Sequence, residues 1–269
     1  MLGSSRESLA AASEALDARR SAAGFDTLAA ELFAVADLLG REKQLRTTLA
    51  DSGQPLTVRK SLVDSLLGSR VAPLTLEVVN VVVDSRWSNE NDLVEAVETL
   101  ANQAAFTVAQ NANTLDATED EIFRFGRAVD ASSDLQMALT DPAASVATKS
   151  AIVRDLLAHR ATATTVQVLE FAAGHLHGRR LDAVVDALVE QAARQRDRLV
   201  AEVRVAAPLT DEQSRRLADL LGRLKGRTVR VNVAIDPSVL GGVYVKIGEE
   251  VIDGTVANRM EQARRAVIG

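Results

Sequence analysis

The sequence predicts a mainly α-helical protein that ends in a small α+β domain. Three observations predict this fold class. Apolar residues recur at helical spacing through residues 1–196, this part of the chain contains an internal repeat, and the pattern changes to period-two alternation near Arg198. We therefore expect two tandem helical bundles, residues 1–105 and 106–196, followed by a β-α-β-β-α module at residues 197–269.

The helical part of the chain is a duplication. A shift of 90 residues aligns residues of the same type and order, and a two-residue deletion then places residues 93–97 opposite residues 181–185. Self-similarity at a fixed offset indicates a repeated structural module. The aligned pairs include Glu31 and Glu121, Phe33 and Phe123, Leu49 and Leu139, Asp51 and Asp141, Val63 and Val153, and Val78 and Val168.

Each copy shows the spacing of amphipathic helices. Thr118-x-x-Glu121 matches a capping box and predicts that a helix begins there. Breaks at residues 52–55 and 141–142 fall at matching places in the two copies, so short helices joined by short loops indicate bundles of about five or six helices. The apolar stripes are Leu62, Val63, Leu66 and Leu67; Ile152, Val153, Leu156 and Leu157; Leu93, Val97, Leu100 and Ala104; and Leu181, Val184, Val185, Leu188 and Ala192.

The C-terminal module begins with an alternating strand at residues 199–205. A capping box, Thr210-x-x-Gln213, then predicts a helix whose apolar stripe is Leu217, Leu220, Leu221 and Leu224. Alternation predicts two further strands, at residues 228–235 and 243–247, joined through Asp236-Pro237 and Gly241-Gly242. A last helix is expected after Asp253-Gly254, with Val256, Met260, Ala263 and Val267 along one face.

Composition excludes several classes of protein. The chain has 269 residues, a net charge of −6 and no cysteine, so disulfides and thiolate metal sites are excluded. No segment carries the basic stripe or the aromatic platforms that nucleic-acid binding needs. The N-terminus lacks the apolar core of a signal peptide, and no apolar run approaches the roughly 18 residues of a membrane span. We expect no direct membrane insertion, so another subunit would hold the chain at any membrane.

No motif for catalysis or cofactor binding is present. The sequence contains no phosphate-binding loop, no Gly-x-Gly-x-x-Gly after a strand and no Gly-x-Ser-x-Gly. His175 and His177 are either a metal pair or a solvated helix end, and the missing third ligand favours the helix end. Gly241-Gly242 is interpreted as a turn, and Trp87 as a packing residue or a partner contact. We expect no catalytic residue, no cofactor and no metal.

Two C-terminal segments resemble one family closely. Residues 199–213, LVAEVRVAAPLTDEQ, are similar to the start of the C-terminal domain in the delta and oligomycin-sensitivity-conferring subunits of F-type ATP synthases. Residues 236–248, DPSVLGGVYVKIG, and 251–259, VIDGTVANR, resemble that family's signature. Residues 139–142 with 149–157 resemble its N-terminal helical domain. The usual member has one helical bundle, so this chain resembles an enlarged form, and which copy grips the head stays open.

The resemblance implies a non-catalytic stator subunit at the cytoplasmic face of the cell membrane. The helical part would bind N-terminal helices of the alpha subunits, and the C-terminal module would hold a b-type peripheral stalk subunit, so that proton-driven rotation is coupled to ATP synthesis. Candidate partner-binding residues are Leu9, Val78, Val82, Leu240, Gly241, Gly242, Ile252, Asp253 and Gly254. Burial in the bundle core is the alternative for Leu9, Val78 and Val82. A helical-repeat scaffold of another cytosolic assembly, or an enzyme with an unrecognised site, are the alternative functions.

Overall fold

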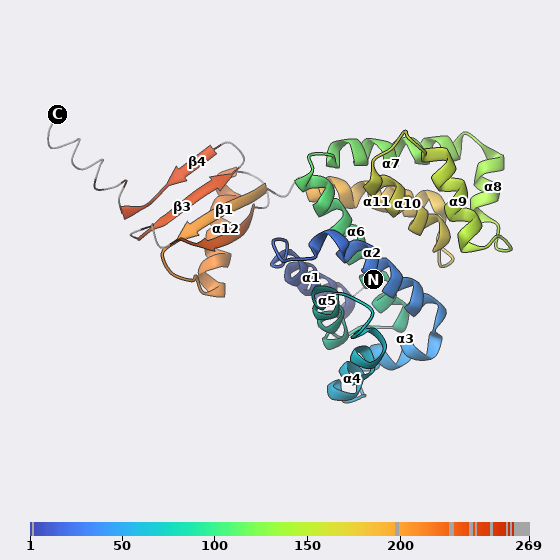
Figure 1. Cartoon of the computed structure of the whole chain (residues 1–269), viewed down its shortest axis with the longest axis horizontal. Coiled ribbons are helices and arrows are strands. Elements are labelled where there is room, and N and C mark those ends of the chain that lie inside the picture. The colour runs from blue at the N-terminus through green and yellow to red at the C-terminus, as the bar shows by residue number, and fades with distance from the viewer. Residues whose placement is uncertain are drawn as a thin grey trace. The chain divides into compact units, whose positions relative to one another are not determined.

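The computed structural model divides the chain into two compact units, Met1–Gln195 and Arg196–Gly269 (Figure 1). The structure describes residues 1, 3–196, 199–225, 229–236, 239, 241–247, 250–256, 258 and 260. The first unit is helical and the second is a sheet with one described helix. This order confirms the predicted mainly α fold with a small α+β end. No helix within the described ranges is both long and apolar enough to span a membrane.

The helical unit follows the repeat closely. Helices α2 to α5 begin at residues 25, 43, 56 and 73, and α7 to α10 begin 90 residues later, at 115, 133, 146 and 163. The helices of this unit are α1 (Ser4–Asp17), α2 (Phe25–Arg41), α3 (Lys43–Ala50), α4 (Leu56–Leu67), α5 (Pro73–Asp84), α6 (Glu90–Asn111), α7 (Leu115–Asp130), α8 (Ser133–Thr140), α9 (Val146–Leu157), α10 (Ala163–Gly174) and α11 (Leu181–Arg196).

Helix α6 occupies a place in both copies. Aligned with α11, it is the last helix of the first copy. The shift of 90 residues also places α1, residues 4–17, on residues 94–107, which lie inside α6. The same helix is therefore the counterpart of α1 in the second copy, and residue 105, the expected end of the first bundle, lies within it. In Figure 1, α1 to α5 gather on one side of α6 and α7 to α11 on the other.

Polar contacts also repeat. The Glu31 carboxylate accepts a hydrogen bond from the backbone N–H of Ala72 at 2.7 Å, and Glu121 accepts one from Thr162 at 2.8 Å. Both acceptors thereby satisfy an N–H group at the start of an equivalent helix, α5 in the first copy and α10 in the second, where helices lack internal partners. The predicted capping box at Thr118 is wrong, because α7 begins at Leu115 and Thr118 is fully buried inside it. Glu121 caps a neighbouring helix instead of its own.

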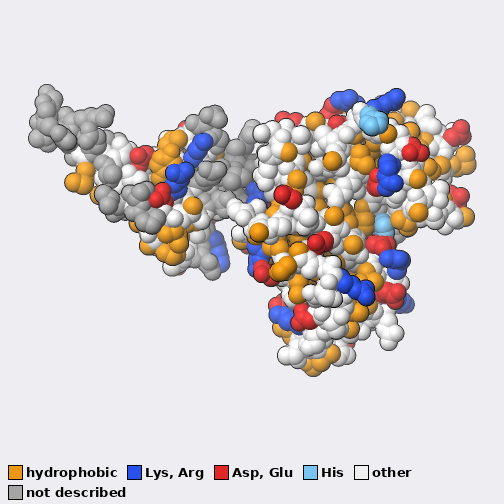
Figure 2. All heavy atoms as spheres, viewed as in Figure 1, with side chains coloured by type: hydrophobic (Ala, Val, Ile, Leu, Met, Phe, Trp, Pro, Cys, Tyr) orange, Lys and Arg blue, Asp and Glu red, His pale blue; other side chains and the backbone are white. Residues whose placement is uncertain are grey.

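One hydrophobic core runs through both copies. It includes the predicted stripe of α11 and the whole stripe of α6, whose side chains are all buried. Trp87 is buried and donates its indole N–H to the Val82 carbonyl at 2.8 Å, which confirms the packing interpretation. Leu156 departs from the prediction, since its side chain is 43% exposed. On the face shown in Figure 2, acidic and basic side chains are interspersed across this unit.

The C-terminal unit is a four-stranded sheet in the order β2-β1-β3-β4. Strands β1 and β2 are parallel, while β3 is antiparallel to both β1 and β4, so the chain crosses over through α12 and returns as a hairpin. Strand β4 was not expected from the sequence, because only four residues form it. The elements are β1 (Leu199–Val205), α12 (Asp211–Lys225), β2 (Val229–Ile235), β3 (Val243–Ile247) and β4 (Glu250–Asp253).

Helix α12 confirms one prediction and corrects another. Gln213 Oε1 accepts from the Thr210 backbone N–H at 2.8 Å, and Thr210 Oγ1 accepts from the Gln213 N–H at 3.2 Å, which is the predicted capping box. The predicted stripe is buried only in part, however: Leu221 is buried and Leu217 partly buried, whereas Leu220 and Leu224 are 63% and 66% exposed. A helix on one sheet face buries a narrow stripe, which here contains Leu221. The predicted last helix lies largely outside the described residues.

Candidate functional site

A cleft lies where α6, α10 and α11 meet, with α1 at its edge. The cavity has a volume of about 240 Å³, and its apolar lining comes from Phe171, Ala172, Val184, Ala187 and Leu188 of α10 and α11. Its polar lining comes from Glu95, Glu98, Thr99 and Asn102 of α6 and from Gln191 and Arg194 of α11. Leu9 of α1 lies at its edge, partly buried against the core. The Gln191 side chain donates to the Thr99 carbonyl at 2.7 Å and ties α11 to α6 beside the cleft.

Charged groups cross the cleft mouth. Glu98 is buried, and its Oε2 accepts a hydrogen bond from Arg179 Nη2 at 2.8 Å while its Oε1 lies 2.9 Å from His177 Nε2. Glu95, Glu98 and Arg179 also line a second, more polar cavity of about 410 Å³ together with Arg46 and His177. A lining that combines apolar and charged side chains suits an amphipathic helix better than a small metabolite.

His175 forms a contact between the copies. Its Nδ1 lies 2.9 Å from the Phe171 carbonyl oxygen, and its Nε2 lies 3.0 Å from Asp37 Oδ1 of α2. Both ring nitrogens therefore face protein oxygens. His177 is exposed, as a solvated helix end predicts, whereas His175 is partly buried, which that interpretation did not anticipate. Within the described residues, no group of three or more His, Cys, Asp or Glu side chains is arranged to hold a metal ion.

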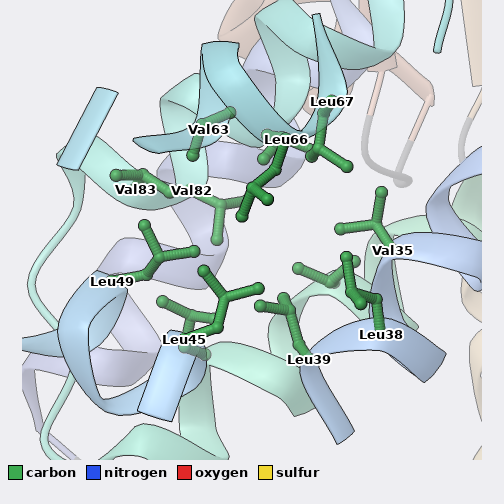
Figure 3. Close-up of a pocket in the computed structure, with 13 residues that line it drawn as sticks. Val35, Leu38, Leu39, Leu45, Leu49, Val63, Leu66, Leu67, Val82 and Val83 are labelled. Atoms are coloured by element: carbon green, nitrogen blue, oxygen red, sulfur yellow. The ribbon is translucent and has the colours of Figure 1, made fainter. Parts of the chain in front are cut away.

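Val78 and Val82 lie in the core of the first copy. Their side chains are 3% and 1% exposed, which agrees with the core alternative for both. Val82 lines a purely apolar cavity of about 10 Å³ among α2, α3, α4, α5 and α6, into which the labelled side chains of Figure 3 point. A gap of this size is at the lower limit for one water molecule and offers no polar partners. A partner helix can reach neither valine in this conformation.

The predicted C-terminal residues meet at one end of the β3–β4 hairpin. The Gly254 N–H donates to the Val243 carbonyl and the Val256 N–H donates to the Gly241 carbonyl, both at 2.9 Å. Gly242 has φ +84°, and a Cβ there would lie 2.4 Å from the Gly254 carbonyl oxygen. The glycine turn is thus confirmed, and two chain segments touch through its backbone. Leu240 lies outside the described residues.

Ile252 and Asp253 play different parts at this end of the hairpin. Ile252 packs partly buried against the sheet core. Asp253 is exposed, and its carboxylate accepts the Thr255 backbone N–H at 3.0 Å. Hydrogen bonds from the Thr255 side chain and backbone lower the pKa of Asp253, so its ionised form is held in place at neutral pH. The arrangement orders a turn and contains no nucleophile paired with a base.

Comparisons with known proteins agree with one another. A family model described as ATP synthase delta (OSCP) subunit matches residues 102–267. Proteins named ATP synthase subunit delta are similar over nearly the whole chain: that of Streptomyces avermitilis is 46% identical over 98% of this chain and 97% of its own length, and that of Streptomyces griseus 44% over 100% of both. The Kineococcus radiotolerans protein is 40% identical over 99% of this chain and 98% of its own.

The family model and the relatives match different lengths of the chain. The model match begins inside α6 and covers the second copy with the C-terminal unit. The relatives cover the first copy as well, so they share the enlarged form. A chain in a solved structure of the Toxoplasma gondii mitochondrial ATP synthase hexamer covers 64% of this chain at 20% identity, but its TM-score of 0.28 carries no argument.

Proposed function

The chain belongs to the ATP synthase delta (OSCP) family, and we propose that it is the non-catalytic stator subunit that links the catalytic head of an F-type ATP synthase to the peripheral stalk. Similarity at 46% identity over 98% of the chain is the observation that carries this proposal. The division into two compact units supports it, because a link needs two separate binding surfaces. Such a link resists rotation of the head, so that proton-driven rotor movement is coupled to ATP synthesis.

We assign the two ends of this link to different units. Residues 1–196 hold the N-terminal helices of the alpha subunits, and residues 197–269 hold a b-type stalk subunit. The cleft beside Leu9 supports the first assignment, since its mixed apolar and charged lining fits an amphipathic helix. Val78 and Val82 would then act by packing α5 and not by contact. The ordered turn around Gly241, Gly242 and Asp253 supports the second assignment. Leu240, which precedes this turn in the sequence, is assigned to the same surface.

The proposed location is the cytoplasmic face of the cell membrane, where other subunits hold the chain as a peripheral component.

The subunit composition of the native complex tests the proposed function. A tagged full-length chain purified from mild detergent extracts is expected to bring down alpha and b subunits in fixed proportions. A different and reproducible set of partners would instead support the alternative, a helical-repeat scaffold of another cytosolic assembly.

A further inference from the structure

One face of α2 is covered by the second copy. Phe33 is 6% exposed, and its ring centroid lies 4.5 Å from that of Phe171 in α10. One turn further along α2, the Asp37 carboxylate lies 3.0 Å from His175 Nε2. Because Phe33 and Asp37 are spaced i, i+4, as are Phe171 and His175, the contact joins two helical pairs, one apolar and one polar.

The repeat reproduces this face on α7, where nothing described covers it. The shift of 90 residues that aligns the copies places Phe123 on Phe33 and Arg127 on Asp37. Phe123 is 54% exposed and Arg127 is also exposed. The core side of α7 is formed by other residues, Ile122, Phe125 and Val129, all of them buried. Phe123 therefore contributes little to the core.

Helix α7 packs closely against α11 beside this face. A Cβ added to Gly126, three residues after Phe123, would lie 2.9 Å from Val185 Cγ1, so α7 and α11 approach each other closely at this glycine. A side chain presented from a fixed helix loses less conformational entropy on binding than one on a loop, which favours a docking role.

We propose that Phe123 and Arg127 form a docking surface for an amphipathic helix of another subunit in the same assembly. The contact in the first copy indicates the geometry, in which a helix offers an apolar side chain and a polar one a turn apart. The change from Asp37 to Arg127 reverses the charge, so the partner presents a carboxylate where His175 stands in the covered copy. This inference rests on the proposed function, because we look for the partner among the other subunits of the ATP synthase.

Cross-linking in the purified ATP synthase tests the surface. A photoreactive phenylalanine analogue replaces Phe123 in the full-length chain, and the same analogue at Met137, which is 65% exposed on α8, is the matched control. We expect position 123 to cross-link to another subunit, within a helical segment that carries Asp or Glu one turn from an apolar residue. The same analogue at position 137 is expected to give at most a tenth of the cross-linking yield at position 123.

A charge reversal provides the second arm. Arg127→Glu, combined with the analogue at position 123, is expected to reduce the cross-link about tenfold while the thermal unfolding midpoint of the isolated chain stays unchanged, because Arg127 is exposed. Cross-links that form only to lipid or to the C-terminal unit of the same chain overturn the inference, as does an equal yield at both positions or no yield at position 123. If the complex contains the chain but position 123 gives no cross-link to another subunit, only this docking surface is wrong. If the chain is never incorporated into the complex, the proposed stator role is wrong as well.

Discussion

Equivalent residues of the two copies accept different numbers of hydrogen bonds. The Glu31 carboxylate accepts one backbone N–H, that of Ala72. Its counterpart Glu121 accepts the Thr162 N–H at 2.8 Å, the Thr162 hydroxyl at 3.0 Å and the Thr165 hydroxyl at 2.6 Å. Hydrogen bonds to charged groups contribute more than neutral ones, so a network of three weighs more than a single bond.

This difference predicts unequal costs of removal. Glu121→Ala is expected to lower the free energy of unfolding by about 3 kcal/mol, and Glu31→Ala by about 1 kcal/mol, since each leaves helix-start donors without an acceptor. Urea denaturation of the two variants measures both values in one protein. Equal losses would mean that the hydroxyl donors add nothing.

The backbone at Gly242 gives a second residue-scale prediction. Gly242→Ala combines a positive φ with a Cβ 2.4 Å from the Gly254 carbonyl oxygen, whereas Gly24→Ala has the same φ of +84° and nothing within 4 Å. The control should cost about 1–2 kcal/mol, the strain of a left-handed residue, and Gly242→Ala should cost more because the hairpin must move. Gly242→Val should also weaken binding of the stalk helix. Hydrogen exchange measures the loss of protection in the unit that carries each variant, and a loss for Gly242→Ala no larger than that for Gly24→Ala would contradict the steric account.

At the scale of elements, the periodicity of apolar residues predicted most of the helices, but it did not predict that one helix, α6, belongs to both copies. The stripe of α6 was visible because its apolar residues recur every turn, yet its place in both copies emerges only from three-dimensional packing. The Thr118 prediction failed because a local capping pattern competes with a tertiary contact, Glu121 to Thr162. The cleft was also beyond sequence reasoning, since its lining brings Leu9 together with residues of α6, α10 and α11 that are far away in the sequence. Strand β4 is too short to show a period.

Because α6 belongs to both copies, we can predict where a fragment that contains the second copy must begin in order to fold. A fragment of residues 90–196 keeps all of α6 and is expected to fold, because residues 94–107 occupy the place that α1 takes in the first copy. A fragment of residues 106–196 loses Val97, Leu100, Ala101 and Ala104, all fully buried, and should not unfold cooperatively. Circular dichroism with urea titration distinguishes them. A stable 106–196 fragment would show that the copies are independent bundles.

At the scale of the whole molecule, the chain consists of two compact units, and our proposal assigns one partner to each. The helical unit has one continuous core, and the sheet unit has its own. Neither contains, in its described part, a constellation suited to catalysis. Two cores allow each unit to keep its surface while the other is bound, which is the property that a mechanical link requires.

The most direct test is whether one chain binds both partners through separate units. Immobilised full-length chain is expected to retain a peptide of the alpha N-terminal helix and a soluble stalk helix at the same time, measured by biolayer interferometry. A fragment of residues 1–196 is expected to retain the alpha peptide with unchanged affinity and to lose the stalk helix, because helix-in-groove docking needs only the helical unit. A folded fragment that captures the stalk normally, or that loses the alpha peptide, would contradict the account.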